Sequence, residues 1–357
     1  MINKTSWNSI LVLALLVLWF SVLGYPSEVV TAVTVEDGLG RTVEVPENVE
    51  RIVGLEAGAL RLITYLEATD LVVGVEEFEK RDRKRPYRLA HPELANLRSI
   101  GPIHGGDPEL IAAARPDVIF WTYTTKGKAN DLQNKTGIPV VGLNYGGAGT
   151  MNWDTFYSTL RLVGKVLNKE GRAEKVVEFF KDEISNLREL GNSATESSIS
   201  VYVGGIGQRG ARGIVSTEPA YPPFSFLSLN NVAGKLGVEH AFINEEKLLQ
   251  WDPDYLFVDE AGLSLVRRDL NQSTFKGLSA VRSGKVFGLL PYNYYTTNFG
   301  TVLANAYYVG KLIYPGAFEG VNPVEKANEL YNFLLGERVY PEMEEIFGGY
   351  GQIDITS

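Results

Sequence analysis

The chain of 357 residues is 45% hydrophobic and 22% charged, and its 43 acidic against 34 basic residues give a net charge of −9. This composition excludes disordered, collagen-like and coiled-coil proteins, and the acidic balance argues against nucleic-acid binding, which needs a basic excess. The absence of cysteine excludes disulfides, thiolate metal sites and a cysteine nucleophile. The length predicts two domains.

Residues 1–32 are expected to form an export leader. Lys4 precedes an apolar run, ILVLALLVLWFSVL, over residues 10–23. The run is shorter than the roughly 20 residues of a membrane span and typical of a secretory signal; a buried N-terminal helix is the alternative. The small residues Gly24 and Ala32 are both acceptable sites for cleavage of the leader. No cysteine follows the apolar run, so a lipid anchor on an N-terminal cysteine is excluded. We therefore expect an extracytoplasmic protein, either released or held in the membrane by an uncleaved leader.

Residues 33–150 predict a first α/β lobe. Alternating valines on both sides of an Asp37-Gly38 turn predict a hairpin over residues 33–46. Short apolar runs then alternate with helical patterns, which indicates a parallel sheet covered by helices. The expected strands cover residues 51–56, 71–76, 116–121 and 138–143, and the expected helices cover residues 58–66, 108–114 and 126–135.

Residues 151–191 predict a helical connector between two lobes. Apolar residues recur at helical spacing over residues 153–190, with one interruption near Gly171; two ordinary helices within one domain are the alternative. A second strand–helix series follows, so residues 192–357 predict a C-terminal α/β lobe. Its expected strands cover residues 199–205, 255–260 and 285–290, and its expected helical tail covers residues 323–347.

An internal repeat supports two lobes of similar topology. Glu109 begins ELIAAARPDVIF and Glu246 begins EKLLQWDPDYLF, and in both segments a Pro-Asp pair leads into an apolar strand. GIPVVGL at residues 137–143 matches GKVFGLL at residues 284–290 in the same order. One match alone is weak, because helix–Pro-Asp–strand is a common unit, but two matches in the same order favour two similar lobes.

No motif in the sequence indicates catalysis or a cofactor. The GxGxxG at residues 205–210 is followed by three prolines and no helical period, so a loop is favoured over a dinucleotide site. Walker and GxSxG motifs are absent, and no carboxylate pair is singled out as acid and base. His91, His104 and His240 are scattered, and they could form a metal site only if all three converged. We therefore expect neither an enzyme nor a bound cofactor.

The loops after the predicted strands are rich in aromatic residues, and ligands bind at this edge of open α/β sheets. Aromatic faces with hydroxyls and two arginines suit a bulky, partly apolar and partly anionic ligand, whereas a small inorganic ion would prefer backbone amides and compact polar groups. Each of these residues also has a purely structural alternative. The aromatic residues could pack at the bases of their loops, the arginines could be exposed on the surface, and the glutamate could cap the following helix. The expected ligand-binding residues are Glu56, Trp121, Tyr123, Tyr145, Arg209, Arg212, Tyr221, Tyr292, Tyr294 and Tyr295.

Over essentially the whole mature chain, the sequence resembles the extracytoplasmic solute-binding proteins of ABC importers for iron–siderophore complexes, haem and cobalamin. The resemblance implies two α/β lobes joined by a long helix, a ligand bound between them, and a permease with its ATPase as partners. It rests on VTVEDGLGRTVEVPENVERIV, DPELIAAARPDVIFW, GIPVVGL, EEKLLQWDPDYLFVD and FKGLSAVRSGKVFGLLPYNYYTTNFGTVLANAYYVGKLIYP.

In the family that the chain resembles, one glutamate on each lobe forms salt bridges with permease arginines. The matching positions are Glu109 and Glu246. Their alternative role is that of solvated residues early in a helix, where the helix dipole favours a negative charge. The resemblance thus implies a monomer that captures an iron(III) chelate, with cobalamin or haem as the next candidate cargo.

An exported chelatase-type enzyme on a related two-lobed scaffold is the rival interpretation. It would be favoured if His104 and His240 faced carboxylates across the cleft. Transport would be favoured by a cleft lined with Trp121, Tyr145, Tyr221 and Tyr292.

Overall fold

The computed structural model describes residues 31–81, 83–146, 151–193 and 199–355. The expected leader therefore lies outside the described residues, apart from its last two positions. Among the described residues, no helix has the length and apolar character needed to cross a membrane.

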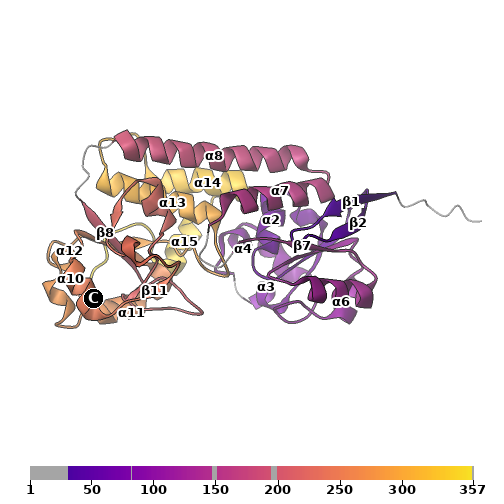
Figure 1. Ribbon diagram of the computed structural model, residues 1–357, viewed down its shortest axis with the longest axis horizontal. Helices are drawn as coiled ribbons and strands as arrows, with labels where there is room; N and C mark the ends of the chain where they lie inside the picture. The colour runs from indigo at the N-terminus through magenta and orange to yellow at the C-terminus, as the bar shows by residue number, and fades with distance from the viewer. Residues whose placement is uncertain (1–30, 82, 147–150, 194–198, 356–357) are drawn as a thin grey trace, which may run out of the picture.

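A hairpin and a five-stranded sheet form the N-terminal part of the chain (Figure 1). Strands β1 (Ala32–Glu36) and β2 (Thr42–Pro46) pair antiparallel, which confirms the predicted hairpin. The sheet has the order β5-β4-β3-β6-β7 with every pair parallel, as the strand–helix alternation predicts. Its strands are β3 (Ile52–Leu55), β4 (Val72–Val75), β5 (Arg98–Ser99), β6 (Val118–Thr122) and β7 (Val140–Leu143). The helices of this part are α2 (Ala59–Tyr65), α3 (Glu77–Arg81), α4 (Pro86–Ala90), α5 (Pro108–Ala114) and α6 (Lys126–Thr136).

A second parallel sheet forms the C-terminal lobe, with the order β10-β8-β12-β13. Its strands are β8 (Ser200–Gly204), β10 (Asn230–Asn231), β12 (Tyr255–Asp259) and β13 (Val286–Leu289). Two short strands, β9 (Ser216–Thr217) and β11 (Ala241–Phe242), pair antiparallel beside it. The helices of this lobe are α9 (Pro222–Phe226), α10 (Glu245–Trp251), α11 (Leu263–Leu270) and α12 (Ser279–Arg282).

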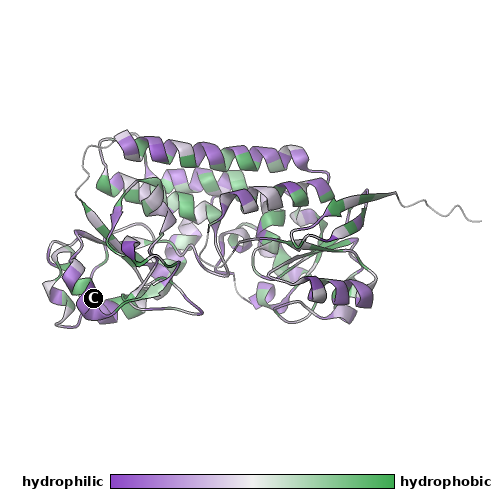
Figure 2. Cartoon of the chain, in the orientation of Figure 1, coloured by the Kyte–Doolittle hydropathy of each residue, from purple (hydrophilic) through white to green (hydrophobic). Residues whose placement is uncertain are grey.

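A layer of helices lies along one side of both sheets (Figure 1). It contains α7 (Trp153–Val166), α8 (Glu170–Ser193), α13 (Phe299–Ile313) and α14 (Pro323–Leu335), and α15 (Tyr340–Phe347) follows α14. Helix α8 runs the length of the layer and alternates hydrophilic and hydrophobic residues, as expected for a helix with one solvated face (Figure 2). The interruption expected near Gly171 lies just before it, at residues 167–169 between α7 and α8, where Asn168 has φ 53°.

Helix α13 is the longest of the elements that the strand–helix pattern did not reveal. It packs against α8, α9 and α14, and thirteen of its fifteen residues are buried. A helix covered on all sides has no polar face, so its sequence lacks the amphipathic period that marks a surface helix. Helices α13 and α14 fall in the range expected for the C-terminal lobe, yet they share a layer with α7 and α8 of the expected connector. The division of the chain at residues 33–150, 151–191 and 192–357 therefore stays a prediction.

Helices α5 and α10 occupy equivalent places in the two sheets, which accounts for the internal repeat. Each has seven residues and precedes a strand that has a neighbour on both sides. Glu109 and Glu246 are the second residues of these helices. Both helices end on a left-handed residue that is not glycine, Arg115 with φ 49° and Asp252 with φ 38°.

An aromatic cluster joins the helical layer across the two halves of the chain. The rings of Phe156 in α7 and Phe299 in α13 stack with centroids 3.8 Å apart, and Trp153 lies edge-on to Phe156 at 6.1 Å. Aromatic pairs at such distances contribute stability beyond the apolar area that they bury.

We expect Phe156→Ala to lower the free energy of unfolding by about 3–5 kcal/mol, because it leaves a cavity in this fully buried cluster. Urea denaturation followed by circular dichroism measures the change. The control is Phe242→Ala, at a ring that is 58% exposed, for which a change of about 0.5 kcal/mol or less is expected. Equal losses in both variants would contradict the assignment of the core.

Candidate ligand-binding cleft

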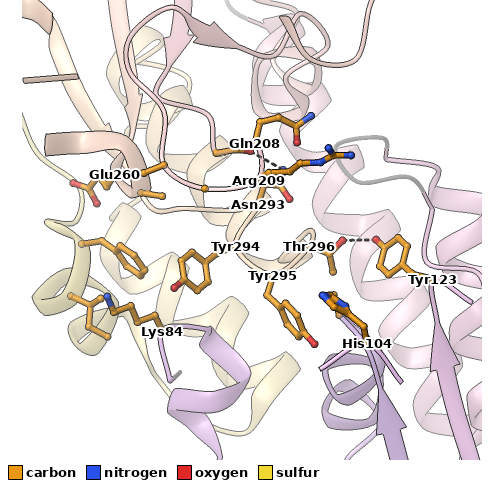
Figure 3. Close-up of a pocket in the computed structure, with 17 residues that line it drawn as sticks. Lys84, His104, Tyr123, Gln208, Arg209, Glu260, Asn293, Tyr294, Tyr295 and Thr296 are labelled. Carbon is orange, nitrogen blue, oxygen red and sulfur yellow. Dashed lines mark hydrogen bonds between the residues drawn. The ribbon is translucent and has the colours of Figure 1, made fainter. Parts of the chain in front are cut away.

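A cavity of about 930 Å³ lies between the two sheets, and its volume is within the range typical of small-molecule sites (Figure 3). Its wall is built by loops that follow β3, β5, β6, β8, β12 and β13, together with the segment between α3 and α4 and the end of α15. It is lined by Ala57, Lys84, His104, Tyr123, Gly207, Gln208, Arg209, Gly210, Ala211, Glu260, Ala261, Asn293, Tyr294, Tyr295, Thr296, Ile346 and Phe347.

Four of the residues expected at the cleft line this cavity: Tyr123, Arg209, Tyr294 and Tyr295. Glu56 lies next to the lining residue Ala57, and its carboxylate is 2.8 Å from the His104 ring. The structure therefore brings together residues from both halves of the chain.

The other expected cleft residues lie elsewhere. Trp121, Tyr145, Tyr221 and Tyr292 are buried at the bases of their loops, where their rings pack in the core. Arg212 does not line the cavity, because its Nε donates to the Gln208 carbonyl and its guanidinium lies over the Phe242 ring. Sequence reasoning missed Lys84, His104, Gln208, Glu260, Asn293, Thr296, Ile346 and Phe347.

Few local signals mark these missed residues. Phe347 ends a helix more than fifty residues from the nearest other lining segment, and only the fold brings it to the cavity. Glu260 follows directly after β12, so the rule that ligands bind at the carboxyl ends of strands could have identified it.

The glycine motif at residues 205–210 forms part of the cavity wall. The segment from Gly205 to Val215 holds no helix, which confirms the prediction of a loop and leaves no helix N-terminus for a pyrophosphate. The guanidinium of Arg209 makes no hydrogen bond or ion pair with any residue in the described part of the chain. It points into the space between the lobes (Figure 3).

Two buried carboxyl groups at the cleft have raised pKa values. Burial raises the pKa of Glu260 to about 8, although its Oε2 accepts the Gly349 N–H at 2.9 Å. Burial likewise raises the pKa of Glu76 to about 7, and this carboxyl accepts the N–H groups of Glu56 and Gly105, each at 2.9 Å. At neutral pH Glu260 is therefore largely protonated, and the cations Lys84 and Arg209 are not offset by it.

Backbone strain is concentrated at this cavity. Six of the eleven non-glycine residues with positive φ in the described chain lie at its wall or beside it. Left-handed conformations disfavour side chains, and most of all a β-branched one, so such residues persist only where their surroundings enforce them. They are Glu56, His104, Tyr123, Arg209, Tyr295 and Thr296.

The two histidines named for the rival enzyme interpretation do not face carboxylates across the cavity. His104 pairs with Glu56 from its own lobe, and the Nε2 of His240 lies 2.9 Å from the Ser216 hydroxyl. Burial lowers the pKa of His240. Within the described ranges, no group of three or more His, Cys, Asp or Glu side chains is arranged to hold a metal ion.

Two α/β lobes with a ligand-sized cavity at the strand ends fit a protein that binds a small solute between its lobes. Residues 52–292, about two thirds of the chain, match the family model described as periplasmic binding protein, so the chain belongs to this family. Proteins of the family bind and deliver solutes to ABC importers and are not enzymes, and membership implies an extracytoplasmic location.

The chain is similar to the molybdate-binding protein MolA of Haemophilus influenzae, with 24% identity over 324 residues, 83% of this chain and 89% of MolA. Among solved structures, a periplasmic solute-binding protein from Veillonella parvula superposes with a TM-score of 0.70 at 18% identity, over 89% of this chain and 97% of that one. The structure of MolA bound to molybdate superposes with a TM-score of 0.67 at 21% identity, over 86% of this chain and 98% of that one. The haem-binding protein HmuT superposes with a TM-score of 0.54 at 18% identity, over 79% of this chain and 89% of that one. These structures share the fold.

The raised pKa values predict that stability falls as pH rises. Glu76 and Glu260 have folded pKa values of about 7 and 8, above the ordinary value of 4.5, so the folded state holds protons that the unfolded state has lost. The stabilisation is complete below about pH 4.5 and is lost as pH rises through 7 and 8, with a slope of up to about 1.4 kcal/mol per pH unit for each proton.

Urea denaturation between pH 5 and pH 8 measures this slope. Glu260→Gln keeps a neutral group that can accept the Gly349 N–H, so we expect a shallower decline than in the wild type. Glu325→Gln, at an exposed carboxyl in α14, serves as control and should keep the wild-type slope. A Glu260→Gln slope equal to that of the wild type would show that the Glu260 carboxyl is not held protonated.

Proposed function

We propose that this solute-binding protein captures a bulky anionic iron(III) chelate of the siderophore type between its lobes and delivers it to a membrane permease. The observation that carries the proposal is the cavity itself: about 930 Å³, lined by aromatic rings and by cations. Tyr123, Tyr294 and Phe347 offer apolar faces, whereas Lys84 and Arg209 offer positive charge. A partly aromatic, negatively charged complex matches both properties.

Molybdate is a second candidate ligand, because the relative MolA is a molybdate-binding protein. Three polar donors line the cavity near one another and could hold an oxyanion. Gln208 and Arg209 are neighbours in the sequence, and Asn293 lies beside them in the cavity wall (Figure 3). A bare tetrahedral oxyanion would fill only a small part of the cavity, which is why the chelate is preferred. Haem and cobalamin remain alternative cargoes of the same size class, and HmuT is a haem-binding protein.

We further propose that Glu109 and Glu246 contact the permease. Helices α5 and α10 run antiparallel to the strands that follow them, so their first turns lie at the carboxyl ends of the strands, on the cleft side of each lobe. Both glutamates are exposed. Exposed apolar side chains lie near them in the sequence, Leu110 at 45% and Phe242 at 58%, and exposed apolar residues are typical of surfaces that bind other proteins.

The leader at residues 1–32 is proposed to direct export, after which the mature protein works as a monomer that meets its permease and ATPase at the membrane.

The ligand is identified by metal analysis of the purified protein and by fluorescence titration. Trp121 is a suitable reporter, because its ring stands 2.8 Å from the point where a Cβ on Gly105 would lie, behind the loop that carries His104. The titrants are an iron(III) tris-catecholate chelate, haemin, cobalamin and molybdate. Saturable quenching by the chelate supports the proposal, and saturation by molybdate alone would overturn it in favour of oxyanion binding.

Removing the unpartnered cation should weaken binding of the chelate. We expect Arg209→Ala to raise the Kd of the iron(III) tris-catecholate by about tenfold or more, because a charge-assisted contact contributes about 1.5–3 kcal/mol. The matched control is Arg268→Ala, at a side chain that is 71% exposed on α11 of the same lobe, and its Kd should equal that of the wild type. Equal Kd values for both variants would remove Arg209 from the site.

Charge reversal tests the docking surface. The double variant Glu109→Arg, Glu246→Arg should abolish uptake into cells while its Kd for the chelate stays unchanged, since neither side chain lines the cavity. Glu170→Arg, at an exposed glutamate in the first turn of α8, is the control and should retain uptake. Loss of chelate binding in the double variant would contradict a docking role.

A further inference from the structure

A buried arginine of the N-terminal lobe holds a loop of the C-terminal lobe. Arg61 in α2 is 1% exposed, and its Nη1 donates to the Tyr145 hydroxyl at 2.6 Å and to the Thr297 carbonyl at 2.8 Å. Its Nη2 donates to the Tyr295 carbonyl at 3.2 Å. The Tyr145 hydroxyl also donates to the Thr297 carbonyl, at 2.8 Å. Two groups from one lobe thus hold two carbonyls of the loop that follows β13.

The same loop is held from within by Asn298, the residue that precedes α13. Its Nδ2 lies 3.1 Å from the carbonyl oxygen of Tyr292, 3.0 Å from that of Tyr294 and 3.3 Å from that of Thr296. Asn298 therefore binds the carbonyls of residues 292, 294 and 296, and Arg61 binds those of residues 295 and 297. The two side chains together determine the path of the whole loop.

This anchoring supports a strained conformation. Tyr295 and Thr296 have φ values of 52° and 62°, in the left-handed region, which costs about 1–2 kcal/mol for each such residue. Successive strained residues revert to extended backbone unless their surroundings oppose it. Arg61 binds the carbonyl of the residue before Thr296 and that of the residue after it. These hydrogen bonds hold the backbone on both sides of Thr296 and so oppose its return to an extended conformation.

The strained conformation directs side chains into the cavity. Tyr294, Tyr295 and Thr296 all line it (Figure 3). The Thr296 hydroxyl lies 2.5 Å from the Tyr123 hydroxyl across the lobe boundary. The Tyr295 ring packs on Phe78 with centroids 4.5 Å apart.

An arginine suits this position because its planar guanidinium can donate to several acceptors at once, which a lysine ammonium does less well at fixed angles. The described residues give Arg61 no ion pair, and all three of its acceptors are uncharged. Burying a charge without a counter-ion is unfavourable, so its presence calls for a role beyond stability.

We propose that Arg61 is a positioning residue for ligand binding: it fixes the loop of residues 292–298 to the N-terminal lobe and thereby presents Tyr294, Tyr295 and Thr296 to the ligand. The inference rests on the proposed use of this cavity as the ligand site.

The loop of residues 292–298 has contacts with both lobes. Although the loop follows β13 in sequence, it is bound to the N-terminal lobe. Toward the loop after β8, Asn293 Nδ2 donates a long hydrogen bond to the Gly207 carbonyl, at 3.5 Å. The Tyr292 ring packs on Tyr221 of the C-terminal lobe with centroids 5.6 Å apart, so the loop is tied to both lobes.

Hydrogen exchange of the intact protein tests the anchoring without a ligand. In Arg61→Lys, we expect peptides covering residues 291–298 to lose protection at least tenfold, since the Asn298 N–H, which donates to the Tyr292 carbonyl at 2.7 Å, would open with the loop. Tyr145→Phe removes one of the two donors to Thr297 and should give a loss of about threefold. It keeps the test decisive if Arg61→Lys does not fold.

The control variant is Arg172→Lys. Its guanidinium also donates to two carbonyls, those of Tyr65 and Phe333, but it lies in the helical layer away from the cavity. We expect it to leave the exchange of residues 291–298 unchanged. Wild-type protection of this loop in Arg61→Lys, or equal losses in Arg61→Lys and Arg172→Lys, would overturn the proposal.

The same variants are then titrated with the iron(III) tris-catecholate chelate. Arg61→Lys should raise the Kd at least tenfold and Arg172→Lys should not. A normal Kd in Arg61→Lys despite a mobile loop would refute the positioning role. If the wild type itself does not bind the chelate, the proposed cargo fails, and the exchange data still decide whether Arg61 holds the loop.

Discussion

The arrangement of the cleft depends on one buried guanidinium between the two lobes. Arg61 reaches from α2 to the carbonyls of Tyr295 and Thr297, and Tyr145 reinforces it. Because these acceptors belong to the loop after β13, the wall of the cavity is assembled from both halves of the chain before any ligand arrives. Preorganisation of this kind reduces the entropy that is lost on binding. The stacked Phe156 and Phe299 hold the same two halves together in the helical layer.

The electrostatics of the cavity follow from unequal solvation of its charged groups. Burial withdraws the carboxyl groups of Glu76 and Glu260 from water. They therefore retain their protons to a higher pH than a solvated glutamate does. Lys84 and Arg209 line the cavity. A chain with a net charge of −9 thus places two basic residues, Lys84 and Arg209, in the wall of the cavity where an anionic solute is proposed to bind. Net charge describes the whole surface, whereas binding depends on the few groups that reach the cavity.

Much of the fold could be predicted from the sequence, and only part of the site. The hairpin, seven of the sheet strands and the pair α7–α8 follow from local patterns of apolar residues. Tyr292 and Tyr294 show why the site could not be read in the same way. They are two positions apart in one loop, yet Tyr292 is fully buried against Tyr221, whereas Tyr294 lines the cavity. No local signal separates them, because the difference arises from what packs against each ring.

The sequence by itself determined the class of fold, the repeat that places Glu109 and Glu246 in equivalent helices, and the family to which the chain belongs. These properties depend on periodicity and on short segments, which neighbouring residues along the chain encode. Only the tertiary structure decided which aromatic residues line the cavity, that Phe347 and Lys84 join them, and that Arg61 donates to the carbonyls of the loop after β13. These contacts join residues up to 236 positions apart, and burial and hydrogen bonding over such separations exist only once the chain has folded.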